Sequence, residues 1–386
     1  MSSSAARRER RDGSTKSSTV KQRTRRGDPI WARLMVLFGA LLMMGSGGAI
    51  VGTKVLLSAT TGAIDQNNML GAAAADGGNQ KSINGALNIL LVGLDERPDN
   101  NELVRADSII ILHIPASHDQ AYLVSIPRDL YVQIPAVKTL HPRAESTKIN
   151  AAYAYGSDKG GRAGGFQVLA ETLKNLANGL TFNAGAIVNF GGFQEVVEAI
   201  GGVDMCLDQE VDSHHIGVDK TGRMVPRYKY PAAKPVHYTV GCRHLAAWEA
   251  LDYVRQRYGL PNTDYDRARH QQQFLKAVLK QAKTQGVTSN PVKALQVMNA
   301  AGKALTVDTN NIDLATWAFT LRNVTDNELV MLKVNNGTFN PKKLADGSEA
   351  EQLSEESAQM LTALQKDKLT EFVMQHPTFI STSAEG

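Results

Sequence analysis

Short runs of consecutive hydrophobic residues, separated by polar turns, recur in the first half of the chain. Residues 87–93, 108–114, 121–126 and 186–190 each have the length and apolar content of a buried strand. A six-residue polar turn joins the second run to the third, so we expect these two to be adjacent antiparallel strands. The pattern therefore predicts a central sheet.

Other segments carry apolar residues at the spacing of an amphipathic helix. They are residues 166–177, 191–200, 244–254, 274–283 and 357–375. The second of them ends at Gly201 and Gly202, which are typical of a helix C-terminus. Because strands alternate with helices, we expect an α/β fold, with a central mixed, largely antiparallel sheet covered by helices.

An uncharged stretch of twenty residues, Leu34 to Thr53, precedes these segments. As a helix it would span roughly 30 Å, the thickness of the hydrocarbon core of a bilayer. We expect a retained single-pass anchor, because the apolar run and the segment before it are longer than those of signal peptides. A cleaved signal peptide is the alternative, since residues 58–60 are small. Basic residues before the run predict a cytoplasmic N-terminus and an extracytoplasmic domain on the cell membrane.

These patterns divide the chain into five segments. We expect a basic, disordered cytoplasmic arm at 1–33, a transmembrane anchor at 34–57, a flexible Ala-, Gly-, Asn- and Ser-rich tether at 58–84, a main domain at 85–285 and a C-terminal continuation of that domain, with a final helix, at 286–386.

Charge is distributed unevenly along the chain. Residues 1–33 hold ten Lys or Arg and three Asp or Glu, a net charge of +7, so the net charge of +4 of the whole chain leaves −3 for the remainder. A slightly acidic body without a helix-turn-helix pattern does not indicate a nucleic-acid partner. The basic arm instead suits contact with anionic membrane lipid.

The chain has two cysteines, Cys206 and Cys242, both on the outer side of the predicted anchor. We expect a single disulfide formed in an oxidising compartment. Two separately buried thiols are the alternative, since free cysteine is often buried.

Acidic side chains lie at the ends of two predicted strands, where open α/β sheets place ligands. Asp95 follows the strand at 87–93, and Asp107 precedes the strand at 108–114. If these strands are antiparallel neighbours, the two carboxylates face each other and repel unless a hard cation lies between them. The pattern predicts Mg²⁺ (or Mn²⁺) at this position. For either aspartate alone, a loop or capping role is the alternative.

Four arginines are candidates for binding phosphate: Arg128, Arg255, Arg257 and Arg267. Guanidinium groups suit this ligand because they are planar, carry several donors and stay charged. Together with the two aspartates, they match a pyrophosphate and its metal. Surface ion pairs between the same residues are the alternative.

The local pattern predicts how these arginines are oriented. On a short strand Arg255 and Arg257, two residues apart, would point to the same face. On a helix the spacing places three further side chains on one face: Arg267, His270 and Gln271. Arg269 points elsewhere, and we expect it to be a solvated charge.

Seven segments follow one another between residues 87 and about 275: NILLVGLDERP, RADSIII, VSIPRDLYV, KINAAYAYG, VNFGGFQEVVEAIGGVD, ALDYVRQRY and DRARHQQQFLKA. In series behind a basic-flanked anchor, they resemble the LytR-CpsA-Psr family of bacterial envelope proteins. The resemblance implies a phosphotransferase that moves a glycan phosphate from a polyprenyl-pyrophosphate-linked glycopolymer to peptidoglycan. It also implies an apolar slot for the lipid, which we expect at 166–177 and 193–200.

The resemblance also implies roles for individual residues. Asp95 and Asp107 would hold Mg²⁺, and the residues nearest the chemistry would be Asp95, Arg128, Arg255 and Arg257. The pyrophosphate would be bound by Arg97, Arg128, Lys148, Asn150, Arg255, Arg257, Arg267, His270 and Gln271. His270 stands where the family often has arginine, so a phosphate contact and a buried polar histidine both stay open. Asp95 is a weak candidate for the general base, because a carboxylate that binds Mg²⁺ is a poor base.

The expected reaction is metal-assisted attack of a sugar hydroxyl on the phosphorus nearest the glycan. The expected partners are the lipid-linked glycan, a peptidoglycan acceptor and membrane lipid, with no nucleic acid. A polyprenyl-pyrophosphate hydrolase and a non-enzymatic membrane-bound regulator, or transcriptional attenuator, are the alternatives.

Overall fold

A computed structural model of the chain describes residues 65–75, 83, 85–94, 103–287, 297, 302, 305–312, 317 and 329–381. The predicted arm and anchor lie outside these residues, as do Asp95 and Arg97. Within the described part of the chain, no helix combines the length and the hydrophobicity needed to cross a bilayer.

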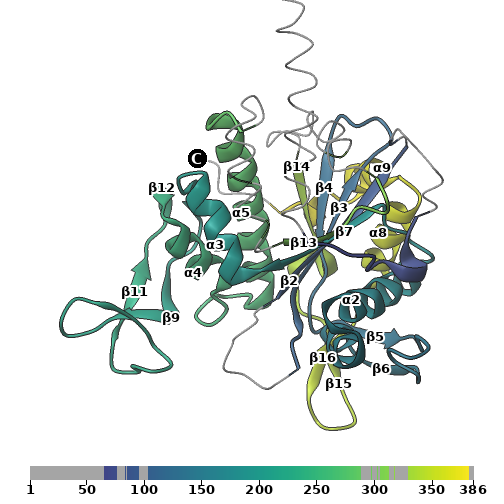
Figure 1. Cartoon of the computed structure of the whole chain (residues 1–386), viewed down its shortest axis with the longest axis horizontal. Helices are drawn as coiled ribbons and strands as arrows, with labels where there is room; N and C mark the ends of the chain where they lie inside the picture. The colour runs from purple at the N-terminus through teal and green to yellow at the C-terminus, as the bar shows by residue number, and fades with distance from the viewer. Residues whose placement is uncertain are drawn as a thin grey trace, which may run out of the picture. The chain divides into compact units, whose positions relative to one another are not determined.

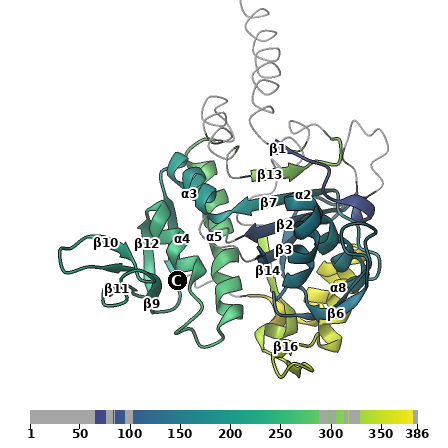
Figure 2. The ribbon, with the colours of Figure 1, turned by 60° about the horizontal axis from the view of Figure 1, so that its bottom comes forward.

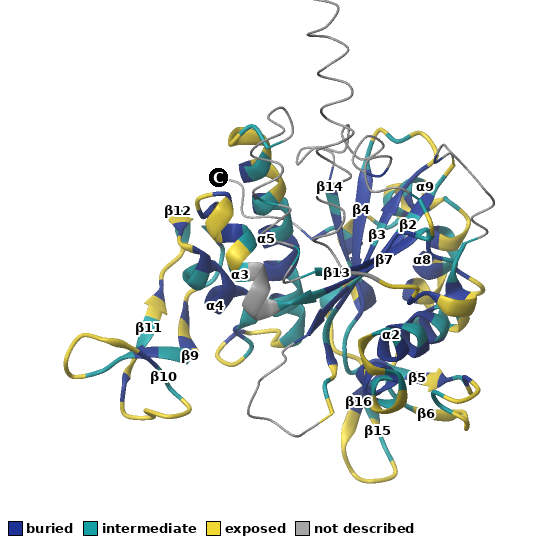
Figure 3. Cartoon of the chain, in the orientation of Figure 1, coloured by how far each residue is buried: buried dark blue, intermediate teal, exposed yellow. Residues whose placement is uncertain are grey.

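Seven described strands form a central sheet in the order β1-β13-β7-β2-β3-β4-β14 (Figures 1 and 2). Their bounds are β1 Asp65–Gln66, β2 Leu87–Leu94, β3 Ala106–Ile114, β4 Ala121–Ser125, β7 Ala184–Asn189, β13 Leu305–Asp308 and β14 Leu329–Lys333. The four strands predicted from apolar runs are therefore β2, β3, β4 and β7. Figure 3 shows that the middle of the sheet is mostly buried.

The sheet is mixed, as predicted, but it is not largely antiparallel. The β2–β3, β3–β4 and β13–β7 pairs are antiparallel, whereas the β2–β7, β4–β14 and β1–β13 pairs are parallel. Antiparallel neighbours such as β3 and β4 are joined by a short turn, which is visible in the sequence. Parallel neighbours need long crossover connections, and the sequence does not reveal which distant strands will pair.

Helices cover both faces of the sheet (Figure 1). One face is covered by α2 (Asn150–Leu176), α8 (Glu355–Gln365) and α9 (Leu369–Gln375). The other face is covered by α4 (Ala247–Arg255) and α5 (Asp264–Thr284), and α3 (Phe190–Ala199) lies beside α4. Phe166 of α2 shares a core with Leu90 and Ile111 of the sheet. Leu123, on the opposite face, belongs to a second core that includes Leu275 of α5.

The remaining described elements are small. The short strands are β5 Tyr131–Ile134, β6 Glu145–Lys148, β8 Val203–Leu207, β9 Val211–Val218, β10 Met224–Pro226, β11 Lys234–Tyr238, β12 Gly241–Leu245, β15 Pro341–Lys343 and β16 Glu349–Glu351. The 3₁₀ turns are η1 Gly71–Ala73, η3 Val334–Gly337 and η4 Pro377–Phe379. Cys206 of β8 pairs directly with Cys242 of β12, and the two form the predicted disulfide.

Part of the predicted tether belongs to the fold. β1 pairs with β13, and Met69 and Leu70, which follow it, are fully buried. Both backbone N–H groups donate to the Asp308 carboxylate, at N–O distances of 2.6 and 2.8 Å. The sequence of this segment has no lasting period because its element is a two-residue strand followed by one 3₁₀ turn. Residues 65–75 are therefore an integral part of the core.

Two predicted helices have different limits in the structure. The helix expected at 244–254 begins only at Ala247, because the residues before it form β12. The helix expected at 357–375 is divided into α8 and α9 at Asp367, whose backbone is left-handed with φ of 57°. β13 and β14 are strands of the central sheet, so the chain beyond residue 286 contributes to the same domain.

Candidate functional site

A cavity of about 320 Å³ lies between the ends of β3 and β4 and the N-terminal half of α5. Its lining is rich in charged and amide side chains: Asp107, Arg128, Asp208, Gln209, Asn262, Asp264, Asp266, Arg267, Arg269, Gln271, Gln272 and Lys333. Four of the predicted site residues therefore line one cavity: Asp107, Arg128, Arg267 and Gln271. The ends of strands and the start of a helix meet here, so fixed side chains and backbone N–H groups converge.

Asp107 lies at an irregularity in the β2–β3 pairing. Gly93 pairs with Ser108 and Leu94 pairs with Ala106, which leaves Asp107 as an extra residue in β3. Such a bulge bends the strand and changes the direction of a side chain, and bulges are common beside active sites. The Asp107 carboxylate forms an ion pair with the guanidinium of Arg128, which follows β4. The bulge thus directs this carboxylate toward the arginine of the neighbouring strand end.

Arg267, in the first turn of α5, is held by the side chain of Asp264 and the backbone of Asp107. Its Nη2 lies 2.7 Å from Asp264 Oδ1 and donates to the backbone carbonyl of Asp107 at 3.4 Å. The side chain is only 11% exposed. Burial lowers the pKa of Arg267, and the negative charges of Asp264 and Asp107 oppose that shift. The positive charges of Arg128 and Arg257 are near enough to add to the lowering.

Arg255 and Arg257 are not arranged as predicted. Arg255 is the last residue of α4, Gln256 caps that helix, and Arg257 follows it, so the short strand expected here does not form. The apolar residues before Arg255 are the buried face of α4, which short-range pattern alone did not separate from a strand. Both arginines lie outside the described lining of the cavity. Arg257 nevertheless approaches it, since its Nε lies 3.9 Å from the same Asp264 oxygen that pairs with Arg267.

Lys148 and Asn150 lie close to the cavity without lining its described part. Lys148 Nζ is 3.5 Å from Asp129 Oδ1, in the turn that also holds Arg128. Asn150 is 1% exposed, and its backbone N–H donates to the carbonyl of Arg128. These two residues therefore fix the turn that presents Arg128.

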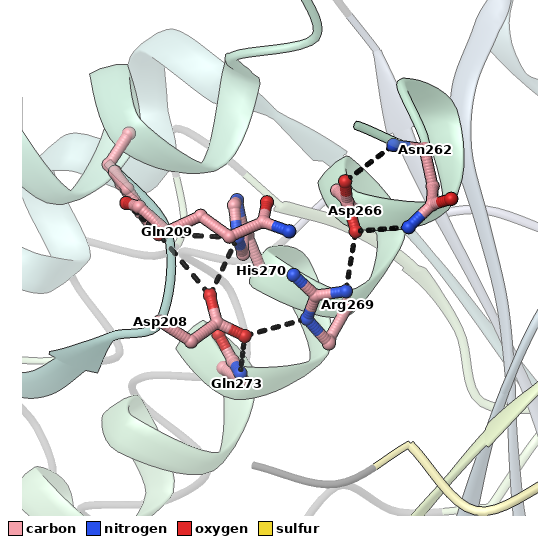
Figure 4. A network of polar contacts seen from close by, with 8 residues as sticks. Asp208, Gln209, Asn262, Asp266, Arg269, His270 and Gln273 are labelled. Carbon is pink, nitrogen blue, oxygen red and sulfur yellow. Dashed lines mark hydrogen bonds and ion pairs between the residues drawn. The ribbon is translucent and has the colours of Figure 1, made fainter. Parts of the chain in front are cut away.

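A second polar network lies along α5 (Figure 4). The Asp208 carboxylate accepts from Arg269 Nε at 2.7 Å and from Gln273 at 3.1 Å, and it lies 2.9 Å from His270 Nε2. Arg269 also donates to Asp266, whose other contacts are with Asn262. Asp208 belongs to the loop after β8, so the network joins that loop to α5.

The prediction for Arg269 was wrong. For His270, the structure matches one of the two alternatives, the buried polar histidine. Arg269 is not a solvated charge, since it is 19% exposed and bound by two carboxylates. His270 is fully buried, stacks on Tyr253 and lies outside the described lining of the cavity, as expected for a buried polar histidine. The sequence missed these partners because Asp208 is about sixty residues away in the chain.

Burial alone would raise the pKa of Asp208, but its hydrogen bonds and charge interactions with His270 and Arg269 outweigh that effect and lower it. The pKa of Asp266 is lowered in the same way, against burial, by the backbone N–H of Asn262 and by Arg269. Both aspartates are therefore held as carboxylates, and their charges on this wall of the cavity are paired with Arg269.

An apolar slot of about 70 Å³ adjoins the polar cavity. It lies between the sheet and helices α4 and α5, and its lining is Leu91, Val92, Gly93, Ser108, Ile110, Val188, Leu251, Val254, Gln271, Phe274 and Leu275. Ser108 and Gln271 line both spaces. No described residue of 166–177 or 193–200, where we expected an apolar slot for the lipid, lines this space, and Phe166 and Leu169 of α2 are buried in the core on the other face of the sheet.

The structure brings one of the two predicted metal ligands to the cavity. Asp107 lines it and offers carboxylate oxygens, the ligand type that Mg²⁺ prefers, while Asp95 lies outside the described residues. Leu94, which precedes Asp95, pairs with Ala106, so the two strands are antiparallel neighbours, which is the condition on which the paired-aspartate prediction depended. Within the described part of the chain, no group of three or more His, Cys, Asp or Glu side chains is arranged to hold a metal.

Two curated proteins are similar to this chain in sequence. The chain is 33% identical over 200 residues to the polyisoprenyl-teichoic acid–peptidoglycan teichoic acid transferase TagU of Bacillus cereus, covering 51% of this chain and 53% of that protein. It is 26% identical to the cell wall biosynthesis protein LcpA of Corynebacterium glutamicum, covering 77% and 58%. The chain thus spans little more than half the length of these two relatives.

A solved structure shares the fold. The crystal structure of B. subtilis TagV matches with a TM-score of 0.55 at 21% identity, over 74% of this chain and 98% of that one. The model of the LytR_cpsA_psr family matches residues 54–367, most of the chain and nearly all of the part described above. The chain therefore belongs to the LytR-CpsA-Psr family.

Proposed function

We propose that this protein is a phosphotransferase that attaches a polyprenyl-pyrophosphate-linked glycopolymer to peptidoglycan. The observation that carries the proposal is that an arginine-lined cavity and an apolar slot share two lining residues, Ser108 and Gln271, and so lie side by side. A lipid pyrophosphate has the same two parts in the same order. The names of the relatives, a teichoic acid transferase and a cell wall biosynthesis protein, support this substrate class.

In the proposed reaction the arginines bind and orient the phosphates. Arg128 and Arg267 line the cavity, and Arg257 approaches it through Asp264, so three guanidinium groups converge from three segments. Fixed donors of this kind stabilise the charge that gathers on the transferred phosphoryl group and on the leaving polyprenyl phosphate. Arg267 is well suited to this role because the Asp264 carboxylate and the Asp107 backbone carbonyl hold it in place before substrate binds.

The reaction we propose is an in-line displacement. The acceptor sugar hydroxyl attacks the phosphorus nearest the glycan, a new P–O bond forms, and the bond from that phosphorus to the bridging oxygen breaks. The hydroxyl proton is lost to solvent or a base, and polyprenyl monophosphate leaves. The apolar slot orients the lipid away from the acceptor, so that attack occurs at the glycan phosphate.

We further propose that Asp107, together with Asp95, holds Mg²⁺ at the strand ends. The fit rests on the oxygen donors of Asp107, which the bulge in β3 presents to the cavity. When bound, the ion would neutralise charge on the pyrophosphate oxygens. We also propose that residues 34–57 anchor the protein in the cell membrane, which would keep the site near its lipid-linked substrate.

The full chain in detergent tests the proposed activity against its alternatives. It is incubated with a polyprenyl-pyrophosphate-linked glycan and Mg²⁺, with and without a peptidoglycan fragment. Acceptor-dependent joining supports the transferase, cleavage that needs no acceptor indicates a hydrolase, and no reaction in either condition indicates a regulator. Repeating the assay after chelation tests the metal, whose removal should abolish joining. The full chain is needed because residues 65–75 are part of the core.

A further inference from the structure

Glu351 of β16 is a buried carboxylate close to the candidate site. It is 2% exposed. Its Oε1 accepts hydrogen bonds from the Tyr265 hydroxyl and, at 2.7 Å, from the side-chain amide of Asn335. Tyr265 lines the cavity, next to Asp264 in the first turn of α5. The C-terminal part of the chain therefore reaches the start of α5 through one carboxylate.

The backbone of Glu351 contacts a different part of the site. Its N–H donates to the carbonyl of Asp129 at 2.9 Å, and the residue forms a bridge with Leu130. Asp129 directly follows Arg128. One residue thus joins the turn that presents Arg128 to the helix that presents Arg267. The two guanidinium groups come from segments about 140 residues apart, so their spacing depends on such a connection.

The surroundings of Glu351 hold it in a fixed position. Asn335, which is buried with its backbone in the left-handed region at φ of 53°, donates to Glu351 and to the carbonyl of Gln352. Its own N–H donates to Ser357 Oγ at 2.7 Å. This polar cluster is built entirely from the C-terminal region, for which the proposed function gives no role.

We propose that Glu351 is a positioning residue, which acts through Tyr265 and the Asp129 backbone to set the separation of Arg128 and Arg267 for binding a pyrophosphate. The proposal rests on the proposed function only for the identity of the ligand. The C-terminal strand pair β15–β16 thereby becomes part of the binding site without touching the substrate.

The protonation state of Glu351 gives the arrangement a pH dependence. Burial raises the pKa of Glu351 to about 6, the hydrogen bonds from Tyr265 and Asn335 oppose this, and the negative charges of Asp129 and Asp264 add to it. Hydrogen bonds to a carboxylate are about twice as strong as those to a neutral acceptor. Below pH 6 the protonated acid therefore holds Tyr265 less firmly, and the affinity for pyrophosphate should fall.

The test uses the full chain and measures binding of geranyl pyrophosphate by calorimetry between pH 5 and pH 8. Glu351→Leu and Tyr265→Phe should each weaken binding about tenfold at pH 7.5, the order expected for loss of a hydrogen bond to a charged group. The double variant should bind no more weakly than either single variant, since both remove one interaction. Glu351→Gln keeps only a neutral acceptor oxygen, like the protonated acid, so at pH 7.5 it should bind about as weakly as the unaltered chain does at pH 5, with no further loss below pH 6.

Tyr122→Phe is the matched control. It removes a buried tyrosine hydroxyl that contacts Thr370 on α9, outside the described lining of the cavity, and should leave binding unchanged. Additive effects in the double variant, or a loss below pH 6 that persists in Glu351→Gln, would overturn the positioning role. If Glu351→Leu does not fold, Tyr265→Phe and Glu351→Gln still decide the matter. A chain that binds geranyl pyrophosphate but transfers nothing would refute the proposed function and leave this inference standing.

Discussion

Asp264 Oδ1 lies 2.7 Å from Arg267 Nη2, one helical turn apart at the start of α5. The pair brings a mostly buried guanidinium to a cavity that also receives Arg128 from the end of β4. A carboxylate in the first turn of a helix is itself stabilised by the helix dipole. Arg267 is therefore fixed before any ligand arrives, which is the property that a phosphate site needs.

Replacing Arg267 should weaken phosphate binding selectively. We expect Arg267→Ala to raise the dissociation constant for geranyl pyrophosphate by about 10- to 100-fold, because a charge-assisted hydrogen bond contributes roughly 1.5–3 kcal/mol. Arg267→Lys should recover only part of the loss, since lysine lacks the planar fork. Isothermal titration calorimetry provides the measurement.

Arg223→Ala is the control for this change in charge. Arg223 is 69% exposed and pairs with Asp219 in the turn before β10. Its removal should leave the dissociation constant unchanged. Equal effects of the two alanine variants would show that binding responds to net charge alone and not to the cavity.

The Asp208 network should stabilise the fold in a pH-dependent way. The folded-state pKa of Asp208 lies below its unfolded value, so its contribution is present above about pH 4 and is lost as the pH falls through the folded pKa. Asp208→Asn should lower the free energy of unfolding at pH 7 by about 1–3 kcal/mol, and by less at pH 3. Urea unfolding at both pH values measures the difference.

Asp204→Asn is the matched control, because Asp204 lies in the adjoining strand β8 and is 68% exposed. It should change the free energy of unfolding little at either pH. If Asp208→Asn behaved like Asp204→Asn, the network in Figure 4 would have no role in stability.

The disulfide should be formed in the native protein and should stabilise it. It closes a loop with a sequence separation of 36 residues, for which loss of chain entropy in the unfolded state gives about 3–4 kcal/mol. We expect the Cys206→Ser/Cys242→Ser double variant to lose roughly that much free energy of unfolding. Thiol titration of the denatured, unreduced chain should find no free thiol, and two thiols would restore the alternative of separate cysteines.

When it is ionised, Glu351 should lower the free energy of unfolding. Its folded pKa of about 6 exceeds its unfolded value, so its favourable contribution is complete below about pH 4.5 and is lost as the pH rises through 6. A shift of this size corresponds to about 2 kcal/mol at most. Glu351→Gln should therefore gain stability relative to the unaltered chain between pH 4.5 and pH 7.5. A constant difference in unfolding free energy across that range would contradict the raised pKa.

The local parts of the fold and site were readable from the sequence. Apolar runs located β2, β3, β4 and β7, and the short polar turn between β3 and β4 indicated that these two strands are antiparallel neighbours. This arrangement is what brings Asp107 to the cavity. Helical spacing likewise indicated that Arg267 and Gln271 share a face, and both line the cavity. These features depend on residues that are close together in the chain.

The features that escaped sequence reasoning depend on distant residues. Arg269 looked solvated because its partner Asp208 lies sixty-one positions earlier. The sequence around Glu351 did not indicate a role at the site, since its contact with Tyr265 joins residues eighty-six positions apart. Arg255 was assigned to a strand because a buried helix face and a short strand have similar apolar content over a few residues. Tertiary contacts, and not local propensity, decided each of these positions.

The most direct test of the central claim is the mass of the product formed by the full chain from a polyprenyl-pyrophosphate-linked glycan and a peptidoglycan fragment. We predict a joined product whose mass equals that of the acceptor plus the glycan phosphate minus one water, together with an equimolar amount of polyprenyl monophosphate. Release of free glycan phosphate and polyprenyl monophosphate in equal amounts with and without the acceptor would contradict the transferase account.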